Sequence, residues 1–289
     1  MTSHVFTSAF AHQDANSHAH SESGASAQNR TFAPRTPRSF TQTWLEVTAN
    51  QPIAAATYQM VLSGNVSAIS QPGQFVNIKI PGFSTRRPLS VCNVDFSEGA
   101  AVGFATIIYK VVGAGTAALA KMPQGTRLNC LVGLGNGFDI SKAGSNPVLI
   151  GGGVGVPPLF LLARRLIDRG AHPTVILGFG SRAEVFYEDE FRALGARVLL
   201  TTADGSAGQQ GFVTAVLPQV KASYIYACGP HAMLTAVAHC SDIPGEFSFE
   251  ERMGCGFGAC MGCVKPTVGG GYKRVCVEGP VIAKEEIAW

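Results

Sequence analysis

The chain has 289 residues, of which 46% are hydrophobic and 14% charged, so it has enough apolar material for the cores of two ordinary domains. Its net charge of +3 is too small to predict binding to nucleic acid or to an anionic membrane. No apolar run reaches the length of a membrane span, and the N-terminus lacks the apolar core of a signal peptide. With eight cysteines, this predicts a soluble protein of a reducing, cytoplasmic compartment.

Residues 1–40 are rich in Ser, Ala, Thr and His and show no hydrophobic periodicity. Such a composition cannot bury a core, so we expect a disordered tail. Its histidines are more simply explained as solvated than as metal-bound. Asp14 and Glu22 are unusual in a transit peptide, and the tail is assigned no function.

Residues 41–141 change to short apolar or alternating runs separated by Gly, Pro, Asn and Ser. Six strands are predicted at 43–47, 57–62, 74–80, 89–95, 101–111 and 127–134. A single weak helix is predicted among them, at 115–121. We expect this region to form a small antiparallel six-stranded β-barrel.

Residues 142–243 alternate between strand and helix patterns. Strands are predicted at 148–150, 174–178, 197–202 and 224–227. Helices are predicted at 156–167, 188–194, near 213–217 and at 232–239. The first of these helices has apolar residues at helical spacing along one face. The alternation predicts an α/β domain with a doubly wound parallel sheet.

A glycine-rich turn at 151–155 joins the first of these strands to the first helix. Its N–H groups and the helix dipole would attract a diphosphate. Pro158 stands where a G-x-G-x-x-G fingerprint has its third glycine, so a plain tight turn remains an alternative. Cys228-Gly229-Pro230 follows the last strand and should lie at the same sheet edge, although a lone cysteine is more often a buried core thiol. That fate is also predicted for three other cysteines: Cys92, Cys130 and Cys240.

Three short motifs in the β-rich region carry groups suited to a flavin nucleotide. Arg87-Pro88-Leu89-Ser90 offers a guanidinium for a phosphate and a hydroxyl for the edge of a flavin ring. Ile108-Tyr109-Lys110 at a strand end and Gly115-Thr116 at a helix start offer stacking, charge and an anion-binding N-terminus. Taken alone, each motif is better explained as ordinary surface or turn chemistry.

The C-terminal region, residues 244–289, contains the spacing C-x4-C-x2-C at Cys255, Cys260 and Cys263, with Cys276 further on. This is the cysteine spacing of plant-type [2Fe–2S] clusters, in which four thiolates hold two irons. The interleaved glycines allow the tightly curled loop that closely spaced ligands need. A structural zinc usually takes two separated C-x2-C pairs, and disulfides suit a secreted chain, so both are weaker alternatives.

In this order, the motifs resemble the ferredoxin–NADP reductase-like superfamily, and within it the branch of class 1B dihydroorotate dehydrogenase electron-transfer subunits. The resemblance covers about residue 41 to the C-terminus, and it also rests on Leu134-Gly135-Asn136-Gly137-Phe138. The arginine motif, the glycine turn and Cys-Gly-Pro are shared across the superfamily. The cluster segment, ending in Glu278-Gly279-Pro280-Val281, is specific to the branch.

The resemblance implies three cofactors and assigns residues to each. FAD would be bound by Arg87, Pro88, Leu89, Ser90, Ile108, Tyr109, Lys110, Gly115 and Thr116. NAD would be bound by Gly152, Gly153, Val154, Gly155, Cys228, Gly229 and Pro230. The [2Fe–2S] cluster would be held by Cys255, Cys260, Cys263 and Cys276. The implied domains are an FAD barrel at 41–141, an NAD domain at 142–243 and a cluster domain at 244–289.

The resemblance also implies a partner, a catalytic subunit that carries FMN and oxidises dihydroorotate to orotate. The two subunits would form a heterotetramer with two copies of each. This chain would pass electrons through the cluster and FAD to NAD+ in de novo pyrimidine (UMP) biosynthesis, and it would hold no acid or base for dihydroorotate chemistry. It implies no nucleic-acid or membrane partner.

Two positions leave open questions. Leu89 stands where the superfamily commonly has a tyrosine that stacks on the flavin, and Tyr109 is the candidate replacement. Arg182, after the second strand of the α/β region, could meet a 2′-phosphate or face solvent, so NAD is not distinguished from NADP.

Two other functions remain as alternatives. One is an NAD(P)H-dependent flavin and iron–sulfur reductase that feeds a different redox partner, although such proteins usually carry a longer, separate ferredoxin domain. The other is a cluster-based redox sensor or zinc-stabilised binding module, which would bind no flavin.

Overall fold

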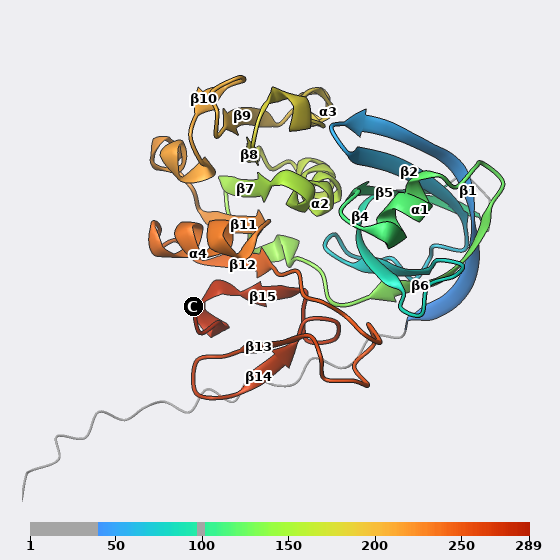
Figure 1. Cartoon of the computed structure of the whole chain (residues 1–289). Helices are drawn as coiled ribbons and strands as arrows, with labels where there is room; N and C mark the ends of the chain where they lie inside the picture. The colour runs from blue at the N-terminus through green and yellow to red at the C-terminus, as the bar shows by residue number, and fades with distance from the viewer. Residues whose placement is uncertain (1–39, 97–101) are drawn as a thin grey trace, which may run out of the picture. The chain divides into compact units, whose positions relative to one another are not determined.

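The computed structural model describes residues 40–96 and 102–289 (Figure 1). The predicted tail lies outside the described residues, apart from Phe40 at its end. All the described residues belong to one compact unit, in which a barrel, a second sheet with its helices and a C-terminal segment follow one another along the chain.

Six antiparallel strands close into a barrel in the order β1-β2-β5-β4-β3-β6, which confirms the predicted barrel. Their bounds are β1 Thr41–Ala54, β2 Thr57–Gly64, β3 Phe75–Lys79, β4 Arg87–Phe96, β5 Gly103–Lys110 and β6 Arg127–Leu134. Alternate side chains point inward, so Leu45 and Val47 of β1 and Met60 and Leu62 of β2 are fully buried. A short helix, α1 (Ala114–Ala120), comes between β5 and β6.

The second sheet has seven strands in the order β10-β9-β8-β7-β11-β12-β15. Their bounds are β7 Pro147–Gly152, β8 Thr174–Phe179, β9 Arg197–Thr202, β10 Gln209–Gln210, β11 Tyr224–Cys228, β12 Gly245–Ser248 and β15 Val281–Ala283. Every neighbouring pair is parallel except β12 and β15. This confirms the predicted doubly wound parallel sheet.

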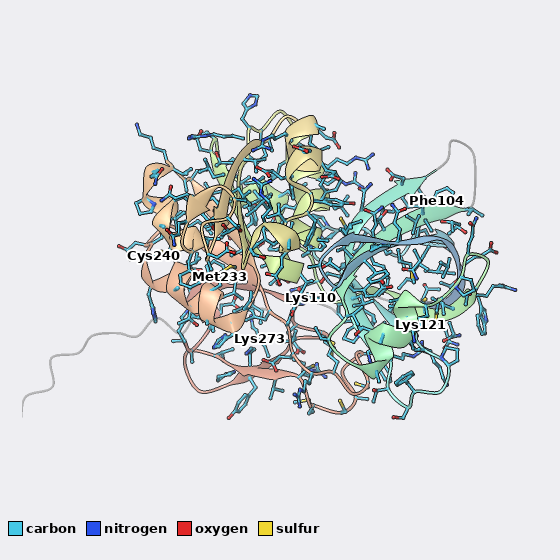
Figure 2. All side chains as sticks on the ribbon, turned by 45° about the horizontal axis from the view of Figure 1, so that its top comes forward. Phe104, Lys110, Lys121, Met233, Cys240 and Lys273 are labelled. Carbon is cyan, nitrogen blue, oxygen red and sulfur yellow. The ribbon has the colours of Figure 1, made fainter. Side chains whose placement is uncertain are left out.

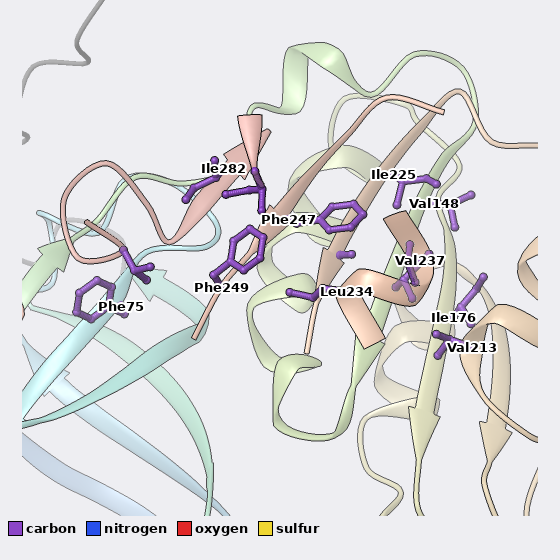
Figure 3. Packing of buried hydrophobic residues seen from close by; sticks show 14 of the residues in the cluster. Phe75, Val148, Ile176, Val213, Ile225, Leu234, Val237, Phe247, Phe249 and Ile282 are labelled. Carbon is purple, nitrogen blue, oxygen red and sulfur yellow. The ribbon is translucent and has the colours of Figure 1, made fainter. Parts of the chain in front are cut away.

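Both faces of this sheet are covered, which is why all six residues of β7 are buried. On one face Leu149 packs in the same cluster as Leu159 of α2 (Pro157–Ile167), together with residues of α3 (Glu188–Ala193). On the other, Val148 packs with Leu234 of α4 (His231–His239), as Figure 3 shows. Within the two described ranges, no helix has both the length and the apolarity to cross a membrane.

Two details of this region differ from the predictions. The predicted helix near 213–217 takes the form of two 3₁₀ turns, Val213–Ala215 and Leu217–Gln219, because Pro218 has no N–H with which to continue an α-helix. The prediction that Cys240 is buried is wrong. Cys240 is the C-cap of α4, where the chain leaves the core, and its thiol is exposed. Cys92 and Cys130 are buried as predicted.

The C-terminal segment packs against both of the other parts. Its strands β12 and β15 extend the parallel sheet, while β13 (Val264–Pro266) and β14 (Tyr272–Arg274) pair as a hairpin. Phe249 and Ile282 of this segment share a core cluster with Phe75 of the barrel and with residues of the parallel sheet (Figure 3). The segment therefore completes a common core.

Candidate cofactor sites

A cavity of ≈350 Å³ opens where the barrel meets the parts that follow it. Its walls include eight of the nine residues predicted to bind FAD: Arg87, Pro88, Leu89, Ser90, Ile108, Tyr109, Lys110 and Thr116. They meet because the start of β4 and the end of β5 lie in neighbouring strands, and α1 follows β5 directly. The ninth, Gly115, lies against Arg87, since a Cβ there would come within 2.5 Å of the guanidinium.

Arg87 presents a fixed positive charge in this cavity. Its Nη1 donates to the carbonyl oxygen and to Oγ1 of Thr85, both at 2.8 Å. The guanidinium also lies 5.3 Å from the ring centroid of Phe83, a cation–π contact. These contacts orient the guanidinium in advance, so it can bind a phosphate without first losing much side-chain freedom.

Tyr109 is held in the barrel core. Its hydroxyl donates to Oδ1 of Asn50 at 2.9 Å, and its ring stacks on Tyr58 with centroids 5.9 Å apart. Burial raises the pKa of the phenol. Only 2% of Tyr109 is exposed, so the ring has little surface to offer a flavin in place of the tyrosine that Leu89 replaces.

A further part of the wall of this cavity comes from the C-terminal segment and was not predicted. It consists of Phe249, Glu250, Glu251, Met253 and Pro280. Glu250 is accessible from the open cavity, yet burial by the surrounding protein raises the pKa of its carboxyl group. Glu251 pairs with Lys265 at 2.5 Å. No local sequence pattern predicts this part of the wall, because it forms only when segments about 160 residues apart in the sequence pack together.

A second cavity, of ≈510 Å³, lies at the carboxyl ends of the parallel strands. Gly153 and Pro230, two of the predicted NAD residues, line it, whereas Val154 lines the first cavity. The glycine turn therefore borders both. Gly153 has φ +51°, and a Cβ at Gly155 would overlap the carbonyl oxygen of Cys228, so the turn needs glycine at both positions.

Cys228-Gly229-Pro230 lies beside the glycine turn, as predicted from the strand order. The register of β11 and β7 pairs Cys228 with Gly151, and a Cβ at Gly229 would come within 3.1 Å of the Gly152 nitrogen. Cys228 is only 1% exposed and lines neither cavity, and burial raises the pKa of its thiol. Its placement is that of a buried core thiol.

Sequence reasoning missed most of the second cavity. Its wall also contains the ends of β8 and β9 and residues that follow each strand, among them Gly178, Phe179, Gly180, Glu184, Thr201 and Phe212. The Gly-Phe-Gly turn was a usable signal, because it too follows a parallel strand and so had to lie at the ligand-binding edge.

The four predicted cluster cysteines form two close pairs. The Cys260 thiol lies against the Cys255 sulfur as a donor, and the Cys276 thiol lies in the same way against the Cys263 sulfur. Burial opposes ionisation of Cys255, but N–H groups of the loop and the Cys260 thiol outweigh it and lower its pKa to about 6. Burial and the nearby Cys263 thiol raise the pKa of Cys276 to about 12.

Two pairs of thiols fit a cluster in which each of two irons takes two cysteines. Within the described ranges, no group of three His, Cys, Asp or Glu side chains is arranged to hold one metal ion. All eight cysteines are free of disulfides. The donor set therefore fits a [2Fe–2S] cluster better than either alternative.

The barrel and the C-terminal hairpin both hold the cysteine loop. Asn77 of β3 donates through Nδ2 to the carbonyl oxygen of Cys255 at 3.2 Å. Arg274 donates to the carbonyl oxygen of Gly258 at 3.0 Å and is itself paired with Glu278. Gly256 and Gly258 have φ of +78° and +97°, so the curl predicted from the glycines is present at these two positions.

Sequence profiles match two parts of the chain. Residues 250–288 match the iron–sulfur cluster binding domain of dihydroorotate dehydrogenase B. Residues 149–239 match the oxidoreductase NAD-binding domain.

Curated relatives match nearly from end to end. Dihydroorotate dehydrogenase B (NAD(+)), electron transfer subunit, from Geobacillus thermodenitrificans is 43% identical over 254 residues, which are 84% of this chain and 97% of that one. The protein of the same name from Fusobacterium nucleatum is 41% identical over 254 residues, covering 83% and 96%.

Solved structures share the fold. A structure of the NADH-dependent reduced ferredoxin–NADP oxidoreductase, described for flavin-based electron bifurcation, superposes with a TM-score of 0.75 at 30% identity and covers 85% of this chain and 90% of that one. Phthalate dioxygenase reductase superposes with a TM-score of 0.59 at 16% identity and covers 86% and 96%, which shows a common fold alone.

Proposed function

The chain belongs to the family of dihydroorotate dehydrogenase B electron transfer subunits, and on this premise we propose that it carries electrons from a catalytic partner subunit to NAD+. The partner would hold FMN and oxidise dihydroorotate to orotate in de novo pyrimidine biosynthesis. We further propose a cytoplasmic heterotetramer with two copies of each subunit.

One observation supports this proposal: the two cavities share a wall, and the first is lined by the segment that precedes the cysteine loop. The glycine turn borders both cavities, through Val154 on one side and Gly153 on the other. The segment from Phe249 to Met253 lines the first cavity and leads directly into the cysteine loop at Cys255. Sites that share walls in this way suit electron transfer within a single chain.

When bound, the cluster would carry single electrons, FAD would exchange either one or two, and the nicotinamide would exchange a hydride. The chain's own residues would bind and orient these groups. Arg87 would neutralise the FAD diphosphate, and the hydroxyl of Ser90 would hydrogen-bond the edge of the ring. Lys110 contributes a second cation at the junction of the barrel and the parallel sheet, where Figure 2 labels it.

At the second cavity the turn at 152–155 would hold the NAD diphosphate. Its backbone leads through a 3₁₀ turn into α2, so the positive end of the helix dipole would favour an anion there, although Pro157 and Pro158 at the start of α2 have no N–H to donate. In the cysteine loop, the N–H of Ala259 donates to the Cys255 sulfur at 3.2 Å, a contact that would stabilise a thiolate ligand. The chain would supply no acid or base for dihydroorotate itself.

The domain limits also stay a proposal, with the FAD barrel at 41–141, the NAD domain at 142–243 and the cluster segment at 244–289. Because β12 and β15 complete the parallel sheet, we define the last limit by cofactor and not by independent folding.

The test is an affinity purification of the tagged chain from its native cell, followed by a dihydroorotate-to-NAD+ assay on the eluate. We expect an FMN-containing subunit to co-purify and orotate and NADH to form together. A chain that elutes alone, with flavin and iron bound, and reduces only artificial acceptors with NADH would instead support a reductase for a different redox partner. If the purified chain contains no flavin, the result would support the redox sensor or the zinc-stabilised binding module.

A further inference from the structure

The wall of the second cavity suggests how this chain distinguishes NAD from NADP, which differ by a phosphate on the 2′-hydroxyl of the adenosine ribose. Glu184, in the 3₁₀ turn Arg182–Glu184 after β8, lines this cavity. We propose that Glu184 accepts a hydrogen bond from the ribose 2′-hydroxyl of NAD and excludes the 2′-phosphate of NADP. This inference rests on the proposed function, because it places the adenosine half of the dinucleotide in the second cavity.

The carboxylate of Glu184 is held in place from both sides. Its Oε2 accepts the main-chain N–H of Gly180 at 3.0 Å, and its Oε1 pairs with Nζ of Lys110 at 2.5 Å. The hydrogen bond from Lys110, followed by that from Gly180, lowers the pKa of the Glu184 carboxyl group, so it is ionised at neutral pH. Each carboxylate oxygen has two lone pairs, so Glu184 can still accept a bond from a ribose hydroxyl.

Three of the N–H donors that a 2′-phosphate could use at this turn already have acceptors within the chain. The N–H of Gly180 is taken by Glu184. Arg182 donates its main-chain N–H to Oγ of Ser206 at 2.7 Å and its Nε–H to the carbonyl oxygen of Ser206 at 3.2 Å. A 2′-phosphate would have to displace these acceptors, whereas a 2′-hydroxyl needs only an acceptor.

The charges around the turn point the same way. The carboxylate of Asp204 accepts from the main-chain N–H and Oγ of Ser206, at 2.9 and 2.6 Å, and it is near enough to Glu184 to oppose the lowering of the Glu184 pKa. Lys110 offsets part of the negative charge of Glu184, because its ammonium is paired with that carboxylate, whereas the Asp204 carboxylate adds to it. Arg182, the side chain that could have met a 2′-phosphate, is held through its Nε–H by the Ser206 carbonyl oxygen and is not among the residues that line the cavity.

The experiment is calorimetric titration of the oxidised, cofactor-loaded chain with NAD+ and with NADP+, which measures binding without turnover. We expect wild type to bind NAD+ more tightly. Glu184→Gln should narrow that preference by about tenfold or more, because it removes one charge that repels a phosphate of about −2 charge. The matched control is Glu188→Gln, which removes an equal charge from an ion pair with Arg192 on α3, outside the cavity, and should leave the preference unchanged.

Three results would overturn the proposal. They are equal affinity of wild type for both nucleotides, the same preference in the two glutamine variants, or loss of all NADP+ binding in Arg182→Ala. If the flavin-loaded chain binds neither nucleotide, the proposed NAD-dependent function fails as well. If Glu184→Gln does not fold, the wild-type chain can be tested instead, by measuring how well 5′-AMP and adenosine 2′,5′-bisphosphate compete with NAD+ for binding. We expect 5′-AMP to compete well and the bisphosphate, which carries the 2′-phosphate, to compete poorly.

Discussion

Gly256→Ala is the substitution that tests the cysteine loop most directly. Gly256 has φ +78°, a conformation that costs a residue with a Cβ about 1–2 kcal/mol. Its added Cβ would also overlap Nδ2 of Asn77, the amide that donates to the carbonyl oxygen of Cys255. Asn77 is only 1% exposed, so displacing it leaves a buried donor unpaired, at a cost of about 1–3 kcal/mol. The sum is about 2–5 kcal/mol.

Gly269→Ala is the matched control, because it separates the two contributions. Gly269, in the turn of the β13–β14 hairpin, has φ +93°, but a Cβ there would meet nothing within 4 Å. The Gly269→Ala variant should therefore lose only the stability that the strained backbone conformation costs, about 1–2 kcal/mol of the free energy of unfolding. We expect urea unfolding to rank wild type above Gly269→Ala and Gly269→Ala above Gly256→Ala.

Iron content separates a local effect on the loop from general destabilisation. Gly256→Ala should lose iron on desalting, because the displaced amide no longer fixes the carbonyl of Cys255 and the loop loses its attachment to the barrel. Gly269→Ala should retain it. The reasoning is refuted if the two variants unfold at the same urea concentration and keep equal iron.

Three other predictions concern single side chains. Cys260→Ser should remove the cluster, seen as lost iron and lost visible absorbance, while FAD stays bound, because the residues proposed to bind FAD belong to the barrel; loss of both would contradict this. Arg87→Ala should weaken FAD retention by about 1.5–3 kcal/mol, the worth of a hydrogen bond to a charged group, and unchanged flavin after dialysis would count against that role. At pH 8, iodoacetamide should label the exposed Cys240 before Cys130, because burial raises the pKa of Cys130 to about 12 and keeps it a neutral thiol; equal labelling in the native chain would argue otherwise.

The order of elements could be predicted because each carries a local signal. Alternating burial in β1 and β2 and the fully buried β7 follow directly from the spacing of apolar residues. The order of the motifs along the chain also predicted a common flavin site for two stretches, Arg87 to Ser90 and Ile108 to Lys110. The closed barrel brings them together, because β4 and β5 are neighbouring strands.

The parts that sequence did not predict depend on contacts between distant residues. Nothing local to Phe249 or Pro280 indicates that they would close a cavity begun by Arg87, because that wall exists only after β12 and β15 join the parallel sheet. The exposure of Cys240 was missed for a related reason: an apolar helical pattern does not show at which residue the chain leaves the core.

The position of the cysteine loop explains how so short a C-terminal segment can hold a cluster. A separate ferredoxin domain must form a hydrophobic core of its own, whereas this segment packs into a core that the barrel and the parallel sheet also form. Val275, next to Cys276, packs in the same cluster as Phe75 of the barrel and Val148 of the parallel sheet. Cys263 and Cys276, two of the proposed iron ligands, belong to the same hydrophobic core and are each only 2% exposed. Two of the four proposed iron ligands are thereby fixed in a core shared with the barrel and the parallel sheet, so the position of the cysteine loop is set by this packing and not by the docking of a separate module.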